Sequence, residues 1–321
     1  MNYSQIRGFN YQPSYGSTGL ENWLYFNPTI VELELRRGKT FFPKFNTVRY
    51  LLSWDAYLRD PEQFAKNFEK SLQIADKLGI KVIPCLFNRR HDPDLDYGGI
   101  YIDHFLPRYS FLLNKENHID GYVQRIVSEH AGDDRILLWD ICNEPFHYPD
   151  PDNVSIEIKN NELVWISGIC DIVRGIDKNK PLGVSIHPFH GMQGLERIGP
   201  LCDVLLIHLY YMYELDDKDK CGKYEEFVAA NKEFSEKYNK PILVTETCWG
   251  ALNDMKRADI VTYTLKVLTR NNIGFLAHAL HYSIVSDLHN PEDVSAGWTG
   301  NFSFITADGS LREGLDVFNV F

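Results

Sequence analysis

Two glutamates stand at the ends of apolar runs that have the composition of β-strands. Glu144 ends the run Leu-Trp-Asp-Ile-Cys-Asn-Glu (residues 138–144) and precedes Pro145, while Glu246 ends Ile-Leu-Val-Thr-Glu (residues 242–246). Because Pro145 cannot donate a hydrogen bond to a neighbouring strand, the strand formed by residues 138–144 must stop beside Glu144. Two carboxylates that flank one opening can cleave a glycosidic bond if one is protonated at rest and the other is ionised. We assign the acid/base role to Glu144 and the nucleophile role to Glu246.

The distance between the two carboxyl groups decides the stereochemistry of such a reaction. A separation of about 5–5.5 Å lets the ionised carboxylate attack the sugar directly, and the anomeric configuration is retained. A separation of roughly 6.5–9.5 Å leaves room for an attacking water molecule, and the configuration is inverted. The sequence leaves both outcomes open.

The elements that must bring the glutamates together are strands that alternate with helices. Eight β-rich runs are expected to be strands: Ile6–Tyr11, Thr47–Trp54, Lys81–Asn88, Ile136–Asn143, Leu182–His187, Val204–Tyr210, Ile242–Thr247 and Phe275–Tyr282. Such an alternation indicates a single-domain α/β fold, a (β/α)8 TIM barrel over residues 1–321, in which the fourth and seventh strand ends face each other. The alternative is an open doubly wound sheet, which favours a glycine-rich first turn, but residues 10–13 read Asn-Tyr-Gln-Pro.

Amphipathic stretches separate the expected strands. Pro61–Leu78 shows the helical pattern most fully, because Asp60 is a suitable N-cap, Pro61 fits the first turn and Gly79 follows the end. Further helices are expected at His118–Ala131, Ile156–Gly175, Tyr224–Tyr238, Lys256–Thr269 and Gly314–Val320. Thr29–Arg37 and Met192–Ile198 are less regular, and no clear helix directly follows the eighth strand.

Two long connections follow the third and eighth strands, at residues 89–117 and 284–303. In a barrel both lie on the C-terminal face, where active sites are assembled. The second connection contains Trp298 in the stretch Gly-Trp-Thr-Gly (residues 297–300). This aromatic ring could stack on a sugar or anchor the loop.

The motif Trp-Asp-x-x-Asn-Glu-Pro, with a second strand ending in Thr-Glu about a hundred residues later, resembles glycoside hydrolase clan A. That clan comprises retaining (β/α)8 enzymes and includes the family 5 cellulases and mannanases. The resemblance implies that Asn143 bonds the substrate 2-hydroxyl and that Arg49, on the second strand, positions the nucleophile. It also matches His208-Leu209-Tyr210 to the sixth-strand His-x-Tyr, in which Tyr210 would hydrogen-bond Glu246.

The chain departs from the family 5 pattern at two strand ends. The third strand ends in Asn88, where a histidine is common, and the eighth reads Ala-His-Ala-Leu-His-Tyr (residues 277–282), without the usual tryptophan. Trp298, Trp249 or Trp54 could supply the missing sugar platform. We therefore include the following among the candidate substrate contacts: Asn88, Trp249, Trp298 and His281.

Composition narrows the class of partner. The chain carries a formal charge of −11 and has a pI near 5.5, whereas nucleic acid requires a basic surface. We expect a carbohydrate partner rather than nucleic acid or a membrane, and the sequence carries no indication of an oligomeric state. The first seven residues, Met-Asn-Tyr-Ser-Gln-Ile-Arg, contain no apolar secretory run, so a cytoplasmic location is expected.

Cysteines and histidines suggest other chemistries that fit the sequence less well. The six cysteines form no Cys-x-x-Cys pair and lie mostly in apolar runs, as reduced buried thiols do. Cys248 is therefore expected to be inert rather than nucleophilic. The histidine pairs 187/190 and 278/281 have a spacing that points side chains to opposite faces of a strand. We expect no catalytic metal and no cofactor.

The resemblance implies a retaining glycoside hydrolase that cleaves β-glycosidic bonds of oligosaccharides or glycosides by double displacement. One alternative is a transglycosylase, which would use the same two glutamates and exclude water. The other is a catalytically weak carbohydrate-binding barrel, which the altered eighth strand favours and the presence of both glutamates disfavours.

Overall fold

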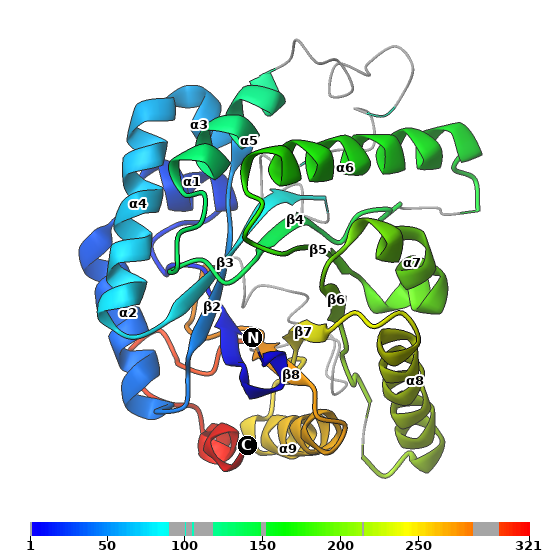
Figure 1. Cartoon of the computed structure of the whole chain (residues 1–321). Helices are drawn as coiled ribbons and strands as arrows, with labels where there is room; N and C mark the ends of the chain where they lie inside the picture. Colours follow the sequence, from blue (N-terminus) through cyan, green and yellow to red (C-terminus); the bar gives the residue numbers. More distant parts are fainter. Residues whose placement is uncertain are drawn as a thin grey trace.

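Eight parallel strands close on themselves in the order of the sequence (Figure 1). The computed structural model describes residues 2–89, 100, 105, 118–148, 152–213, 215–284 and 302–321. The strands are β1 (Arg7–Asn10), β2 (Thr47–Leu51), β3 (Lys81–Asn88), β4 (Trp139–Asn143), β5 (Leu182–Ile186), β6 (Leu205–His208), β7 (Ile242–Thr247) and β8 (Gly274–Ala277). Gly8 of β1 pairs with Thr47 of β2 and with Leu276 of β8, which closes the ring. The predicted (β/α)8 barrel is confirmed, and the alternative of an open doubly wound sheet is wrong.

Helices surround the ring of strands in Figure 1. They are α1 (Gly19–Leu24), α2 (Pro28–Phe41), α3 (Trp54–Arg59), α4 (Pro61–Lys77), α5 (His118–Glu129), α6 (Ile156–Ile176), α7 (Gly191–Ile198), α8 (Lys218–Lys237) and α9 (Asp254–Arg270). Short 3-10 helices are η1 (Tyr3–Gln5), η4 (Pro188–His190), η5 (Gly199–Leu201) and η6 (Leu315–Val320). None of these described helices combines the length and apolar composition that a membrane crossing requires.

Helix caps explain two differences from the predicted boundaries. The expected second strand ran to Trp54, but it stops at Leu51 because the Ser53 side chain accepts from the N–H of Ala56 and begins α3. Asp217 caps α8 in the same way, so α8 begins at Lys218, six residues before its expected start at Tyr224. Gly314–Val320 forms the 3-10 helix η6 rather than an α-helix.

The barrel interior is divided into an apolar end and a polar end. Side chains near the N-terminal ends of the strands form a buried apolar plug that includes Ile83, Leu206 and Leu276. Gly183 makes room for it, since a Cβ atom there would lie 2.5 Å from Leu206 Cγ. Because the plug closes one end of the barrel, polar inward-facing residues gather toward the opposite, C-terminal ends.

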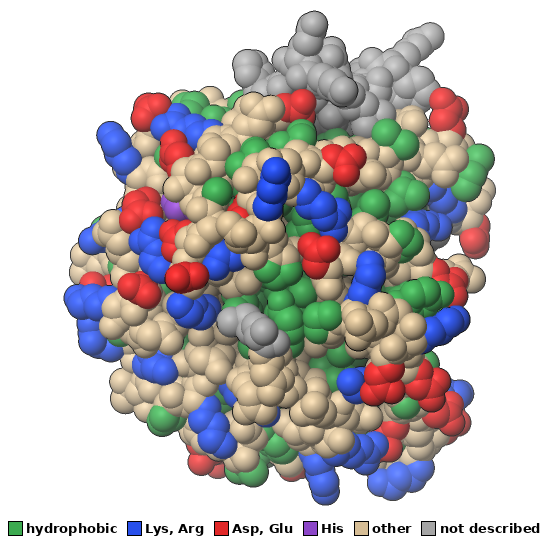
Figure 2. Space-filling view, viewed as in Figure 1, with side chains coloured by type: hydrophobic (Ala, Val, Ile, Leu, Met, Phe, Trp, Pro, Cys, Tyr) green, Lys and Arg blue, Asp and Glu red, His purple; other side chains and the backbone are tan. Residues whose placement is uncertain are grey.

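Figure 2, drawn from the same side as Figure 1, shows acidic and basic side chains mixed around the molecule, with apolar side chains near the middle of this view. The formal charge of −11 is therefore not concentrated in one patch on the described part of this face.

Aromatic packing joins the two ends of the chain. Phe9 of β1 is fully buried, and its ring stacks on Phe318 of η6 with centroids 4.5 Å apart. Phe42 and Phe304 also contact the Phe9 ring, at 5.0 and 5.1 Å. Through these contacts, η6 (red in Figure 1) covers the barrel beside α9.

Three strand pairs shift their register close to the C-terminal ends. The shifts lie between Asp140 and Asn143 in β4, between Ile207 and His208 in β6, and between Val244 and Thr247 in β7. Such bulges re-aim the side chains beyond them and are common beside active sites. Here they lie on the strands that lead to the two predicted catalytic glutamates and to His208.

Candidate active site

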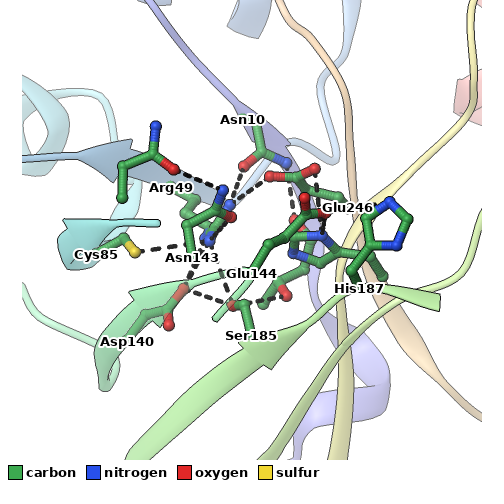
Figure 3. A network of polar contacts seen from close by, with 12 residues as sticks. Asn10, Arg49, Cys85, Asp140, Asn143, Glu144, Ser185, His187 and Glu246 are labelled. Atoms are coloured by element: carbon green, nitrogen blue, oxygen red, sulfur yellow. Dashed lines mark hydrogen bonds and ion pairs between the residues drawn. The ribbon is translucent and has the colours of Figure 1, made fainter. Parts of the chain in front are cut away.

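Glu144 and Glu246 lie together at the C-terminal end of the barrel (Figure 3), and His208 contacts both of them. One oxygen of each carboxylate and one ring nitrogen of His208 all lie within 4.8 Å of one another. His208 Nδ1 is 2.5 Å from Glu144 Oε1 and 3.4 Å from Glu246 Oε2. All three residues are buried. The C-terminal ends of β4 and β7 therefore bring together the two residues that were predicted from the sequence to be catalytic.

Both oxygens of Glu246 accept hydrogen bonds. Arg49 Nη1 donates to Oε1 and the Tyr210 hydroxyl donates to Oε2, each at 2.7 Å. Burial of the carboxylate raises the pKa of Glu246, but its electrostatic interactions with His208, Arg49 and His278 together lower the pKa more. The pKa of Glu246 therefore lies below its ordinary value of 4.5. This environment keeps Glu246 ionised, as a nucleophile requires.

Arg49 is fixed by partners on several strands. Its Nε donates to Asp140 Oδ2 at 2.8 Å, and its Nη1 donates to Asn10 Oδ1 at 2.9 Å in addition to Glu246. Its Nη2 donates to Asn143 Oδ1 at 2.7 Å. The buried cation is thereby held between two carboxylates, and its planar fork has little freedom to turn.

Asn143 connects this network to Asn88. Its side-chain NH2 group donates to Asn88 Oδ1 at 3.0 Å, while its carbonyl oxygen accepts from Arg49. The two asparagines occupy paired positions at the ends of β3 and β4. The role of Asn143 toward a substrate hydroxyl remains a prediction.

The backbone at Glu144 adopts a left-handed conformation, with φ of 47°, and Phe146 does so as well, with φ of 64°. Non-glycine residues hold this conformation only where their surroundings enforce it. The buried Glu162 of α6 provides such a restraint, because its Oε1 accepts from the Phe146 N–H at 2.8 Å. Its Oε1 also pairs with Arg89 Nε at 3.1 Å, and its Oε2 accepts from the Tyr148 hydroxyl at 2.6 Å.

Comparison with known proteins assigns this arrangement to a family. Residues 42–283, which include both glutamates, match Cellulase (glycosyl hydrolase family 5). The chain belongs to glycosyl hydrolase family 5. No curated protein matches it significantly.

Solved glycosidase structures share the fold of this family 5 chain at low sequence identity. The exo-β-1,4-mannosidase Op5Man5 from Opitutaceae bacterium strain TAV5 is 15% identical, with a TM-score of 0.75 over 98% of this chain and 58% of its own. A GH5_18 variant from Streptomyces cattleya, in complex with Manβ1-4GlcNAc, is 14% identical, with a TM-score of 0.70 over 98% and 79% of the two chains. A β-glucuronidase from Ruminococcus gnavus is 14% identical, with a TM-score of 0.66 over 98% and 50%.

The family 5 chain spans only 58% of the mannosidase and 50% of the glucuronidase. At such identities the likeness to these structures concerns the fold. It agrees with the family match, because these structures have the same barrel fold as this family 5 chain.

Two residues that the sequence analysis did not select also face the glutamates of this family 5 site. Asn10, at the end of β1, accepts from Arg49 and donates to the carbonyl of Thr245 at 2.7 Å. His187, directly after β5, holds its Nε2 4.0 Å from Glu144 Oε1. Both could have been found from alternation, because Asn10 shares a face with Gly8, and His187 shares a face with Ser185.

The expected aromatic platforms lie in different places. Trp249 follows β7, and its half-buried ring packs edge-on against Tyr210 with centroids 4.6 Å apart. It therefore stays a candidate for the sugar platform. Trp54 is buried in α3, and Trp298 lies outside the described residues.

The structure does not bring His281 to the glutamate pair. Its Nε2 lies 3.3 Å from Arg37 Nη1 and its Nδ1 lies 3.6 Å from Glu34 Oε1, both on α2. The partners of His281 therefore lie on α2 and not at the catalytic glutamates. The expectation of a substrate contact assumed a strand up to Tyr282, whereas β8 ends at Ala277, so alternation beyond that point carried no information.

Glu144, His208 and Glu246 also form a group that could hold a metal ion, as judged from the described residues. The donors already present on Glu246 make it a poor ligand, because both of its oxygens accept hydrogen bonds and Arg49 places a positive charge beside it. The neighbouring thiol is no better suited to nucleophilic chemistry, since burial raises the pKa of Cys248 to about 12. A chelation experiment tests the metal alternative directly.

Proposed function

We propose that this family 5 chain is a retaining β-glycosidase that acts on β-linked oligosaccharides or glycosides by double displacement. The observation that carries the proposal is the short separation of the two glutamates. One carboxylate oxygen of Glu144 lies within 4.8 Å of one carboxylate oxygen of Glu246. This separation supports direct attack by a carboxylate, because an inverting enzyme needs roughly 6.5–9.5 Å to admit a water molecule between the carboxyl groups and the sugar.

In the first step, a Glu246 oxygen attacks the anomeric carbon while the bond from that carbon to the glycosidic oxygen breaks. Glu144 gives its proton to the departing oxygen, so the leaving group departs as a neutral alcohol. In the second step, Glu144 takes a proton from water, and the hydroxyl oxygen displaces Glu246 from the anomeric carbon. Two inversions at one carbon restore the original configuration.

The surroundings of the two glutamates support this division of roles. Arg49 and Tyr210 both donate to Glu246, which favours its anionic form. Glu144 Oε1 lies 2.5 Å from His208 Nδ1, whereas Arg49 pairs with the carboxylates of Asp140 and Glu246. Arg49 thus places its positive charge beside the carboxylate that must be ionised to act as the nucleophile.

A panel of 4-nitrophenyl β-glycosides, with glucoside, mannoside and glucuronide members, tests the proposal. Wild-type protein should release nitrophenol from at least one member, and NMR should detect the β-anomer as the first-formed sugar. Glu246→Ala should lower kcat by a factor of at least about 10³, because it removes the nucleophile. Activity should persist in EDTA.

Several outcomes would contradict the proposal. A first-formed α-anomer would mean inversion, and loss of activity in EDTA would favour the metal alternative. Undiminished turnover by Glu246→Ala would exclude the nucleophile role. Binding of glycans without release of sugar or nitrophenol would favour a carbohydrate-binding barrel. Glu236→Ala, at an exposed position in α8, is the matched control and should retain wild-type activity.

A further inference from the structure

Arg257 of α9 is a fully buried cation that binds the backbone of segments beside the active site. Its Nε donates to the carbonyl of Trp249 at 3.4 Å, and its Nη1 donates to the carbonyl of Ser303 at 2.5 Å. Its Nη2 donates to the carbonyls of Phe302 and His278, the latter at 3.4 Å. One guanidinium therefore joins the loop after β7, the residue that follows β8 and the segment at residues 302–303.

Three of these carbonyls belong to residues whose rings pack against one another. The Trp249 ring packs edge-on against the Phe302 ring with centroids 5.0 Å apart, and the Phe302 ring packs edge-on against His278 at 5.6 Å. Trp249 also packs edge-on against Tyr210, at 4.6 Å. We call Tyr210, Trp249, Phe302 and His278, in this order, the aromatic chain.

Both ends of the aromatic chain lie beside the predicted nucleophile. At one end, the Tyr210 hydroxyl donates to Glu246 Oε2 at 2.7 Å. At the other end, the backbone N–H of His278 donates at 2.8 Å to the carbonyl of Thr247, the residue after Glu246. The aromatic chain therefore borders Glu246 from two sides, and Arg257 binds the backbone of all its members except Tyr210.

The burial of Arg257 requires that these contacts be well formed. A cation that has lost its hydration is stable only where well-placed acceptors replace the water. Arg257 has four carbonyl acceptors and also lies over the ring of Phe304, with its Cζ 4.8 Å from the centroid. Because the guanidinium is planar and rigid, it fixes the positions of its acceptors relative to one another, which the single ammonium group of a lysine cannot do.

We propose that Arg257 is a positioning residue for the nucleophile. It fixes the aromatic chain, and the aromatic chain holds Tyr210 and His278 in place beside Glu246. The inference rests on the proposed function, because it assigns a role in preparing Glu246 for attack on the anomeric carbon.

Substitutions at two points of this connection test the proposal. Arg257→Lys keeps the charge and loses the planar fork, whereas Phe302→Leu keeps the carbonyl and loses the ring between Trp249 and His278. Each should lower kcat by roughly 10- to 100-fold with little change in KM, because a small displacement of a reacting group is costly in the transition state. The double variant should match the more impaired single variant to within about twofold, since both changes act on one connection. The substrate is the 4-nitrophenyl β-glycoside that wild type hydrolyses fastest.

The pH profile separates positioning from a merely structural role. Burial raises the pKa of Glu246, as does Glu144, whereas His208, Arg49 and His278 lower it. The hydrogen bond from Tyr210 and the interaction with His278 both favour the anion, so weakening them should raise the pKa of Glu246. The acid limb of kcat/KM should then move to higher pH in both single variants. A structural role alone would lower stability and leave the acid limb in place.

A second readout needs no turnover. Urea unfolding compares wild type with Glu246→Gln, and Arg257→Lys with the corresponding double variant, at pH 7, 5 and 3.5. Because the pKa of Glu246 in the folded protein is lowered, its carboxylate stabilises wild type above pH 4.5 and loses this effect as the pH falls. In the Arg257→Lys background the contribution should be smaller and should disappear at a higher pH.

Arg270→Lys is the matched control, because Arg270 is exposed at the end of the same helix and pairs with Glu225. It should retain the wild-type kcat and acid limb. Unchanged kcat in folded Arg257→Lys would overturn the inference, as would an unmoved acid limb or losses that multiply in the double variant. If wild type hydrolyses no glycoside, the proposed function fails, and an unchanged contribution of Glu246 to stability in the Arg257→Lys background would overturn the inference separately.

Discussion

Arg49 shows how much of the site depends on one side chain. It lies between Asp140 and Glu246, so the buried group of three carries two negative charges and one positive charge. Such a group is stable only if its hydrogen bonds are well formed, because each ion has lost its hydration. A lysine at this position would keep the charge but could not supply the planar fork that joins Asp140, Asn143 and Glu246.

The lowered pKa of Glu246 predicts how stability depends on pH. Because the folded-state pKa lies below 4.5, the ionised carboxylate stabilises the fold above pH 4.5, and this contribution disappears as the pH falls through the folded-state value. The free energy of unfolding of wild type, relative to Glu246→Gln, should therefore decrease on acidification below pH 4.5. Urea unfolding at pH 7, 5 and 3.5 measures this difference.

A difference between the two proteins that stays constant across this pH range would contradict the lowered pKa. The acid limb of kcat/KM provides an independent check, since the nucleophile should remain ionised below pH 4.5.

The sequence predicts the residues at the centre of the site better than those at its edge. Glu144, Glu246, Arg49 and Tyr210 came from motifs with fixed spacing, and the structure brings all four together. His281 was misplaced, because its position could be read only from a strand end that the sequence does not mark. The contacts of Asn10 and His187 depend on which face of a strand each occupies, and no motif draws attention to either residue.

At the scale of elements, Glu162 of α6 connects the outer layer to the catalytic loop. Glu162→Gln should lower stability by about 3–5 kcal/mol, because it leaves the buried Arg89 cation without its carboxylate. It should also lower kcat more than it changes KM, since an amide that has lost the ion pair with Arg89 restrains the left-handed segment at Glu144 and Phe146 less firmly. Urea denaturation and steady-state kinetics at a temperature where the variant is folded measure both effects.

Glu157→Gln is the matched control, because Glu157 is exposed on the first turn of the same helix. Unchanged kcat in fully folded Glu162→Gln protein would contradict the proposed restraint.

Periodicity predicted the existence of all eight strands but not all of their ends. Strand β3 was placed correctly because Lys81 and Asn88 bound an apolar run. Strand β8 was predicted to be too long because residues 278–282 continue the strand-like composition after the ladder has ended at Ala277. The six-residue helix α3 was missed because its apolar residues also fit the end of a strand.

At the scale of the molecule, Phe318 of η6 covers the barrel beside Phe9 of β1. Phe318→Ala should lower the free energy of unfolding by about 3–5 kcal/mol, because it opens a cavity against Phe9 and Phe42. We expect wild type and variant each to unfold in one cooperative transition, as a single domain does. Tryptophan fluorescence and far-UV circular dichroism in urea should give coincident curves.

Val320→Ala, at an exposed position in the same 3-10 helix, should change stability little. Separate transitions by the two probes would contradict the single-domain prediction, and an unchanged midpoint for Phe318→Ala would contradict the packing of η6 on the barrel.

The three register shifts also define where segments of this barrel can be exchanged with those of a relative. On the N-terminal side of Asp140, Ile207 and Val244 the strand pairing is regular, whereas on the C-terminal side of these residues the register is shifted. A chimaera joined on the N-terminal side of the shifts transfers each reactive side chain together with the irregular strand segment that orients it. A junction on the C-terminal side of the shifts would transfer the loops only, and the recipient barrel would determine the direction of the carboxylates.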